Sequence, residues 1–419
     1  MTWSIELTRA ANAYSAAAFS GNNTSIGRAL DSTISIADAD PTGSAAALLG
    51  RLDALDAATY NQAVSALSPE SFNVTNALNV HNIRNFTTEQ VAYLAAHRAG
   101  LDATPMPRPG PLPGSMAVAA DDPLLLAAAI AQADQATQPG EVDEDLRWGR
   151  YFKVSGVFAD QDTTTNRTGF DATAFGAQIG IDYAFTTNFV AGLALGYMYT
   201  DADLKLGLGN IQDQSIRAGP YASYYKGDWY LDASATFAWH FYDSDRNNPA
   251  IGEAAHGNYE GYDITGYLGS GYRIHVDRNL TVTPIASVLY SHFYYESFTE
   301  SGSGGMPLTL PSRESDSFRS RLGASVSYRV PGLKFRPIPY LYMGWEHEYL
   351  DDDSIDAAFA SGGNPFTIDV GTRDTDAFFL GGGVNLLVNR NLSAFFRIEG
   401  LTGSNSSSVG AAAGISIAF

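Results

Sequence analysis

The chain of 419 residues contains no cysteine. It also contains no apolar run that approaches the ~18 consecutive residues of a transmembrane helix. The longest apolar run in a helical pattern, Leu124 to Ala131, is too short to cross a bilayer. The sequence therefore predicts no membrane-spanning helix. The lack of cysteine agrees with a protein that crosses an oxidising periplasm, where thiols form unwanted disulfides.

Positive charge is scarce as well. The chain has 25 Lys and Arg against 45 Asp and Glu, a net charge of -20. Because phosphate binding needs clustered Lys and Arg, we expect no nucleic-acid partner. The acidic residues gather in long polar stretches. One of them, Asp351-Asp352-Asp353, lacks the alternating oxygen ligands of a calcium loop, so we expect no metal there.

Patterns that carry catalysis are also missing. The seven histidines are scattered, without metal-binding spacing, and there is no Gly-x-Ser-x-Gly elbow or phosphate-binding loop in context. Ser291 with His292, near the outer end of the seventh predicted strand, is the one candidate catalytic pair. A histidine at the rim of a barrel is more often simply solvated. The sequence predicts that this chain is no enzyme and binds no cofactor.

What the sequence does contain is a regular succession of strands. From Trp148 onward it reads as about twelve strands of ~10–18 residues with a two-residue hydrophobic period. The connections between them alternate short and long, and tight turns occur near residues 186–188, 226–228, 277–279, 331–332 and 389–391. Short periplasmic turns, longer outer loops and an even strand number are typical of a transmembrane β-barrel. The sequence thus predicts a mainly β fold, an antiparallel transmembrane barrel over residues 147–419.

Alternation within single strands supports this interpretation. From Trp229 to Tyr242, one parity is wholly apolar and carries aromatic residues at both ends, whereas the other is polar or small. The first set is expected to face lipid and the second a wet lumen. A soluble sandwich also alternates, but strands of globular proteins usually have only ~5–6 residues. The 279–298 region has apolar residues on both parities, and we expect a bulge that switches parity there.

Residues 1–104 are predicted to be a helical region that joins a passenger to the barrel. Ser68-Pro69 is a helix start, and Thr87 with Gln90 forms a capping box that opens a helix ending at Arg98. Residues 105–120 carry a proline at every second position from Pro105 to Pro113, so they form an extended spacer. Residues 121–140 are predicted to contain a linker helix, at 123–138. No secretory signal peptide is recognisable, so we expect the chain to be part of a longer precursor.

These features resemble the C-terminal translocator unit of autotransporters, the type V secretion route. The resemblance covers roughly residues 45–419. It rests on the twelve-stranded barrel, the helix before the first strand and the Ala/Leu-rich segment Leu52–Arg98 with Leu67-Ser68-Pro69-Glu70. It also rests on a last strand that ends on an aromatic residue, with apolar residues at every second position: Ala413, Ile415, Ile417 and Phe419.

The resemblance implies a location in the outer membrane of a Gram-negative bacterium. It also implies a monomeric translocator and anchor that brings an N-terminal passenger to the cell surface. The implied partners are outer-membrane lipid, the passenger itself and the barrel assembly machinery, which would read the C-terminal signal. The 123–138 helix is expected in the lumen, although its first half is apolar; the alternative is that it docks outside the barrel with residues 1–100. Some relatives cleave the passenger at an Asn pair in that helix, but here the Asn pairs are Asn22-Asn23 and Asn247-Asn248.

The strand parity also predicts which charges face the lumen, because Arg on the lipid face costs about 2–4 kcal/mol at the midplane. The residues expected to face inward are Arg319, Arg321, Arg329, Glu346, Glu348, Arg397 and Glu399. Their expected use is structural, as opposite charges across neighbouring strands. The alternative use is a docking surface for a helix or a translocating chain. A passive porin-like or surface-adhesive barrel with an N-terminal helical plug is the alternative function.

Overall fold

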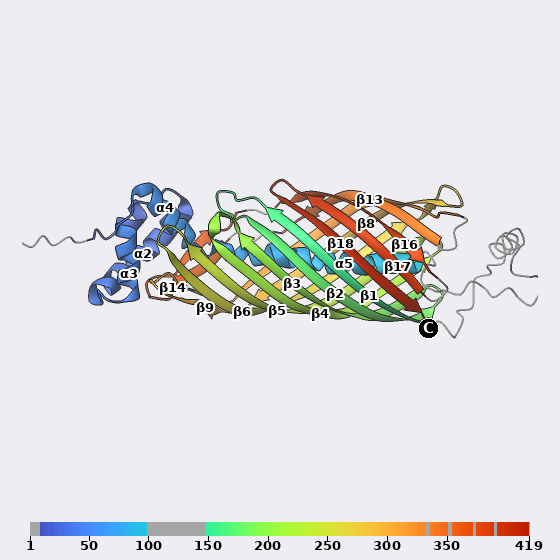
Figure 1. The fold of residues 1–419 in the computed structure, drawn as a ribbon, viewed down its shortest axis with the longest axis horizontal. Helices are drawn as coiled ribbons and strands as arrows, with labels where there is room; N and C mark the ends of the chain where they lie inside the picture. The colour runs from blue at the N-terminus through green and yellow to red at the C-terminus, as the bar shows by residue number, and fades with distance from the viewer. Residues whose placement is uncertain are drawn as a thin grey trace, which may run out of the picture.

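The computed structural model describes residues 9–98, 147–331, 336–350, 354–371, 374–388 and 392–418. It is a long barrel with a helical cap at one end and one helix inside, directed along the barrel axis (Figure 1). The chain ends at the opposite end of the barrel from the cap.

Twelve long strands form the barrel, each antiparallel to its neighbours, and β1 pairs with β18 to close it. This confirms the predicted fold class. The strands are β1 (Trp148–Gln161), β2 (Phe170–Thr186), β3 (Phe189–Leu204), β4 (Gly209–Lys226), β5 (Trp229–Asn248), β6 (Glu253–Tyr272), β8 (Leu280–Tyr295), β12 (Arg313–Tyr328), β13 (Arg336–Glu348), β16 (Asp376–Leu387), β17 (Leu392–Thr402) and β18 (Ser406–Ala418).

The side chains on the barrel wall sort by parity as the hydrophobic pattern predicts. On β5, Trp229, Phe237 and Trp239 are exposed on the outer surface, whereas Asp232 and His240 are buried inside. The 279–298 region differs from the expectation of a bulge. β8 keeps one continuous register with both β6 and β12, so no parity switch occurs there. Apolar residues occupy both faces of β8 because this part of the lumen is itself partly apolar.

The end of the barrel opposite the short turns carries additional strands. A small sheet of β9 (Phe298–Thr299), β11 (Leu308–Leu310), β14 (Ser354–Phe359) and β15 (Phe366–Asp369) stands over the rim. β7 (Ile274–His275) pairs with β8 next to the short turn at 277–279, whereas β10 (Ser301–Gly302) and the single turn η3 (Lys205–Gly207) lie at the end that carries the small sheet. Because long loops mark the outer side of such barrels, we take this end as the outer one.

The helical cap packs on that small sheet. It comprises α1 (Ala13–Ala16), α2 (Gly21–Ala39), α3 (Ser44–Asp53) and α4 (Ala57–Ala66). Ile26 and Leu49 of the cap share one buried core with Leu308 and Ile368 of the outer sheet. Polar contacts add to this core, since Arg246 of β5 donates to the Ala66 carbonyl at 3.0 Å. The cap and the outer loops therefore form one packed unit.

The chain passes from the cap into the barrel through η1 (Pro69–Asn73) and α5 (Val74–Arg98). Ser68 caps η1, as predicted, by accepting a hydrogen bond from the Glu70 amide at 3.2 Å. The capping box at Thr87 was wrong, because α5 begins at Val74 and continues through that position. The hydroxyl of Thr88 instead donates to the Arg84 carbonyl one turn earlier, a bond that lets a polar residue stay inside a helix.

α5 has 25 residues, so it is about 37 Å long at about 1.5 Å per residue. That length exceeds the apolar band of about 25 Å on such barrels. The predicted spacer at 105–120 and the predicted helix at 123–138 lie outside the described residues. Among the described helices, none is both long and apolar enough to cross a membrane.

Candidate functional site

The lumen is occupied by α5, and an asparagine ladder fixes the helix to the barrel wall. Asparagine recurs at every third position, and all five members are buried: Asn73, Asn76, Asn79, Asn82 and Asn85. Residues three apart are neighbours along a helix surface, so the ladder forms one continuous polar stripe. The three-residue spacing is visible in the sequence, but the ladder was not among the predicted site residues.

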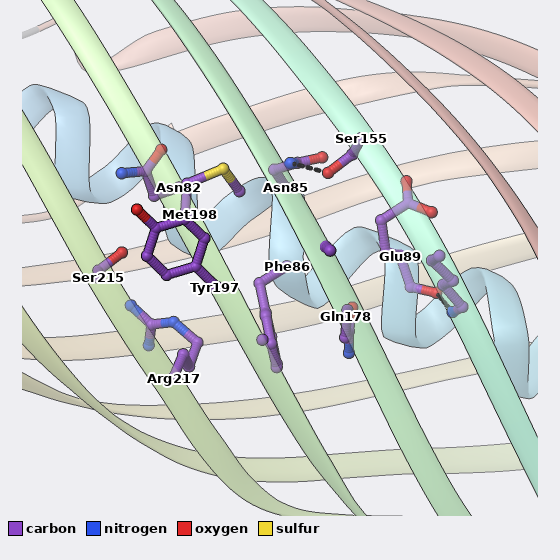
Figure 2. A pocket seen from close by; sticks show the side chains of 13 residues that line it. Asn82, Asn85, Phe86, Glu89, Ser155, Gln178, Tyr197, Met198, Ser215 and Arg217 are labelled. Atoms are coloured by element: carbon purple, nitrogen blue, oxygen red, sulfur yellow. Dashed lines mark hydrogen bonds between the residues drawn. The ribbon is translucent and has the colours of Figure 1, made fainter.

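The ladder contacts strands on one side of the barrel. The Asn79 side-chain amide donates to the hydroxyl groups of Tyr242 and Tyr295, at 2.6 and 3.0 Å. The Asn82 amide donates to Thr200 at 3.0 Å and to Asp213 at 3.2 Å. Asn85 donates to Ser155 at 2.7 Å (Figure 2). A buried amide that bonds its partners avoids the desolvation cost of an unpaired polar group.

The opposite side of the lumen carries the charges that the sequence placed there. Arg84 of α5 pairs with Glu346 of β13, and Arg321 of β12 bonds the same carboxylate at 2.5 Å. Arg319 pairs with Glu348 at 2.5 Å. The two strands hold these residues in register, since Arg319 lies opposite Glu348 and Arg321 opposite Glu346.

A second group of ion pairs joins α5 to β17. Arg397 pairs with Glu89 of the helix and lies 3.3 Å from Glu399. Lys153 of β1 donates to the Glu89 carbonyl from the other side. Arg329 takes no part in this network, because it lies exposed at the short-turn end of the barrel. Six of the seven predicted charges thus come together around α5, and two helix residues, Arg84 and Glu89, complete them.

Four more lumen residues, none of them among the predicted site residues, form a cluster. His240 bonds Asp213 through Nδ1 at 3.0 Å and Asp263 through Nε2 at 2.9 Å. Arg217 donates to both oxygens of Asp263, at 2.7 and 2.6 Å. The four come from neighbouring strands, β4, β5 and β6, so only the pairing register reveals that they meet.

In the described part of the chain, a small and a large cavity lie beside the helix. The smaller one, of about 20 Å³, lies between α5 and the wall of β1 to β4, beside Asn82, Asn85 and Arg217 (Figure 2). A space of this size holds about one water molecule. The larger one, of about 1470 Å³, lies on the side of α5 that faces β8, β12 and β13. It extends from the barrel middle, at Glu346, to the short-turn residues Arg278 and Asn279.

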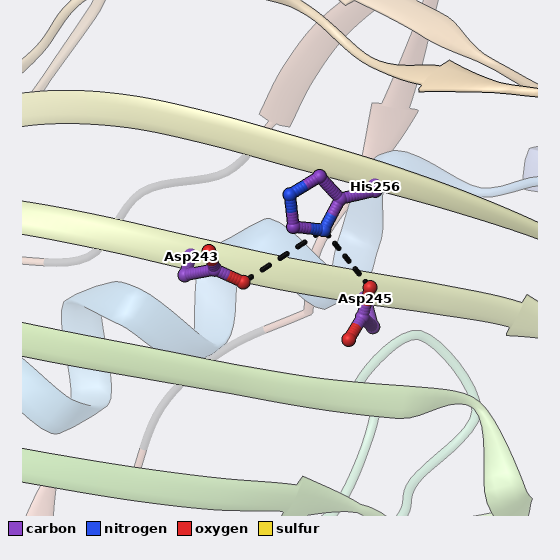
Figure 3. Close-up of side chains that lie close together, drawn as sticks. All are labelled: Asp243, Asp245 and His256. Atoms are coloured by element: carbon purple, nitrogen blue, oxygen red, sulfur yellow. Dashed lines mark hydrogen bonds and ion pairs between the residues drawn. The ribbon is translucent and has the colours of Figure 1, made fainter.

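Two other groups resemble sites but have ordinary explanations. Asp243, Asp245 and His256 lie close together on the outer face of β5 and β6 (Figure 3). His256 bonds Asp245 through Nδ1 at 3.0 Å, and its Nε2 is 2.9 Å from the Asn258 amide, so both ring nitrogens are already engaged. Ser291 and His292 are adjacent in β8, so they point to opposite faces and do not form a catalytic pair.

At the junction of cap and barrel, the carboxyl group of Glu70 is removed from water. Burial raises its pKa to about 7, against the opposing effect of hydrogen bonds from Thr168 in the loop after β1. The predicted C-terminal signal lies at the other end. Ile415 and Ile417 are exposed on the outer surface of β18, and Phe419 lies outside the described residues.

A closed antiparallel barrel with an apolar aromatic outer surface and a polar, charged lumen defines a β-barrel protein of the Gram-negative outer membrane. The family model of the autotransporter beta-domain matches residues 148–399. The chain belongs to this family, a family of transport barrels that work in the outer membrane together with a passenger.

Known relatives agree with this assignment. Outer membrane protein A of Rickettsia conorii is 25% identical over 259 residues, which cover 58% of this chain and 13% of that protein. An extracellular serine protease of Serratia marcescens is 24% identical over 289 residues, 66% of this chain and 26% of that protein. The match thus spans about a quarter or less of these relatives.

Solved structures share the fold. The translocator domain of the autotransporter NalP from Neisseria meningitidis superposes with a TM-score of 0.54 at 14% identity, and covers 71% of this chain and 95% of that chain. The β-domain of the Bordetella autotransporter BrkA gives a TM-score of 0.52 at 19% identity, and covers 65% and 100%.

Proposed function

We propose that this chain is the translocator and membrane anchor of a surface protein, and that α5 is the segment left in the lumen after a passenger has passed. One observation carries the proposal. The N-terminal end of α5 joins the cap at the outer end, and its C-terminal end lies toward the short-turn end, where β1 begins (Figure 1). A chain that has crossed the lumen once, from periplasm to surface, has this arrangement.

The polar anchoring of α5 supports the same proposal. A chain that stops in a polar lumen cannot be held there by hydrophobic contacts. The asparagine ladder and the ion pairs of Arg84 and Glu89 hold α5 in place instead. A passive porin needs an open path. In the described part of the chain, the outer half of the lumen is filled by α5 together with buried aromatic residues such as Tyr242, Tyr259 and Tyr295. The porin-like function is therefore the weaker candidate.

The proposal is tested by the side of the membrane on which the cap lies. An epitope inserted in the exposed cap turn at Asp40–Gly43 should bind antibody on intact cells. The matched control is the same epitope in the Lys226–Asp228 turn, which should bind only after the outer membrane has been permeabilised. A cap epitope hidden on intact cells, with folded barrel in the membrane, would refute the proposal.

We extend the proposal to the helix predicted at 123–138, which would lie in the larger cavity. Arg98 and Trp148 bracket this segment, and Val91, Ala92 and Ala95 of α5 present a largely apolar side to the cavity. The apolar first half of the predicted helix, with Leu125, matches that side. Because the chain has no cysteine, Ala92→Cys with Leu125→Cys should form a disulfide on oxidation. The control pair, Ala92→Cys with Ala117→Cys in the spacer, should not.

We further propose that the chain inserts as a monomer through the barrel assembly machinery, which reads Ala413, Ile415, Ile417 and Phe419, and that it has no catalytic role of its own. Ile415→Asp should reduce assembly, because a charge then stands on the lipid face of β18. Ser416→Asp, on the inward parity of the same strand, is the control. Equal assembly of the two variants would argue against a signal on the outward parity.

A further inference from the structure

The charges of the larger cavity contrast with those of the chain as a whole. Seven arginines and His275 line it, against two acidic residues, Asp277 and Glu346, whereas the net charge of the chain is -20. Arg84, Arg319, Arg321 and Arg397 lie at its inner end. Arg273, Arg278 and Arg329 lie at the short-turn end, where the Arg329 amide donates to the Asn279 carbonyl of the neighbouring turn at 2.8 Å.

These arginines form a graded surface. At the inner end, ion pairs with glutamates of the wall and of α5 largely neutralise them. Toward the short turns, Asp277 is the one acidic residue among the described residues of the lining. Asp228 lies next to this lining and pairs with Arg273 at 4.0 Å and with His275 at 3.1 Å, so the excess of positive charge there comes from Arg278 and Arg329. An excess of one charge inside a cleft with low-dielectric walls concentrates ligands of the opposite charge. The end of the lumen that faces the periplasm therefore attracts anions.

The segment that would pass through the lumen is acidic. Residues 1–73 contain seven Asp and Glu against three Arg, and no lysine occurs before Lys153. The helix that has stopped in the lumen already makes the corresponding contact, because Glu89 of α5 pairs with Arg397 of the wall. Arg397 is buried, and its Nε–H has no hydrogen-bond partner among the described residues.

We propose that the arginine-lined cavity, before the predicted 123–138 helix enters it, is a cationic track that receives acidic, lysine-poor polypeptide in transit. This inference rests on the proposed translocator function and adds the chemical class of the passenger. The carboxylates of the moving chain exchange between Arg278 and Arg329 at the entrance and the inner arginines. Arginine suits this role because its planar guanidinium donates two hydrogen bonds to one carboxylate at the same time and always carries a positive charge.

The test compares two charge reversals at the same end of the barrel in the full chain, exported to the outer membrane of a Gram-negative host. Arg329→Glu changes the cavity, whereas Lys226→Glu changes an exposed turn residue that does not line it. Surface appearance of the cap after pulse labelling should slow about tenfold in Arg329→Glu, a factor in the range of electrostatic steering. It should change little in Lys226→Glu. Heat-modifiable gel mobility reports that both barrels are folded.

A cap without its acidic excess completes the test. Asp38→Lys, Ala58→Lys and Gln62→Lys alter exposed cap positions and bring residues 1–73 close to neutral. With this cap, Arg329→Glu should no longer slow export. Equal rates for Arg329→Glu and Lys226→Glu, or slowing that persists with the neutral cap, would overturn the cationic track. A cap that reaches the surface in no variant, the unaltered chain included, would overturn the translocator function itself.

Discussion

The buried ion pair of Glu89 and Arg397 should control whether α5 stays in the barrel. Replacing Arg397 should destabilise the bound helix more than replacing Glu89. Glu89 is 2% exposed and Arg397 is 6% exposed. Replacing Arg397 with Gln leaves the buried Glu89 carboxylate without its cationic partner. Removing one partner of a buried ion pair costs about 3–5 kcal/mol. In the same variant Glu399 loses less stabilisation than Glu89, because the Tyr342 hydroxyl still donates to it at 2.7 Å and Arg321 lies 3.5 Å away.

Replacing Glu89 with Gln should cost less, because Arg397 keeps Glu399 at 3.3 Å and the Tyr342 hydroxyl at 3.0 Å. The double variant should recover part of the loss, because no isolated charge remains. Amide hydrogen exchange of α5 in the folded barrel measures this directly. A loss of 3 kcal/mol corresponds to about 100-fold faster exchange, at about 1.4 kcal/mol per tenfold. The exchange of β1 and β18 amides serves as the control.

The refuting result is equally definite. If Arg397→Gln and Glu89→Gln accelerated exchange equally, or if both stayed within about fivefold of the unaltered protein, the pair would not hold the helix. Hydrogen bonds of the asparagine ladder, at about 1 kcal/mol each, would then carry the hold alone.

Three further predictions address the cap, the lumen and the lipid face. Because burial raises the pKa of Glu70 to about 7, docking of the cap should be strongest below pH 4.5 and weaken by up to about 3 kcal/mol as pH rises through 7; in Glu70→Gln, denaturant titration of a fluorophore on the cap should show no such trend. Asn82→Ala, which removes the hydrogen bonds to Thr200 and Asp213 of the wall, should raise single-channel conductance in planar bilayers, whereas Ala92→Ser, on the cavity side of α5, should not. Leu341→Arg, at a position 64% exposed to lipid, should destabilise the folded barrel by about 2–4 kcal/mol in vesicles, and an unchanged denaturation midpoint would contradict the outward assignment.

The barrel could be predicted because its signal is local. Alternation along β5 and short turns such as Lys226–Asp228 are readable within a few residues, and parity alone brought Arg321 and Glu346 to one face. β8 was harder, since Ile285 and Leu289 turn toward the cavity while Val288 and Tyr290 face lipid. Two apolar faces look like a switch in parity when the lumen is assumed to be wet throughout.

The lumen helix could not be placed from its own residues. A helix that is polar on most sides is typically exposed to solvent. The asparagine ladder alone does not indicate that its side chains bond to a barrel wall rather than to water. His240 shows the same limit, because its partners Asp213 and Asp263 lie 27 and 23 residues away and meet it only through strand register. Contacts of this range depend on the pairing register of β4, β5 and β6, which no local pattern records.

The position of α5 on one side of the lumen explains why the helix is firmly bound while a large cavity remains beside it. The asparagine ladder binds the helix to one wall, through Ser155, Thr200 and Tyr242, so the free volume collects on the opposite side rather than around it. A helix centred in the lumen would leave only a thin shell of water and would lose these bonds. Displacement toward one wall instead keeps a continuous arginine-lined space open to the short-turn end. The same asymmetry that fixes one segment therefore leaves room for another.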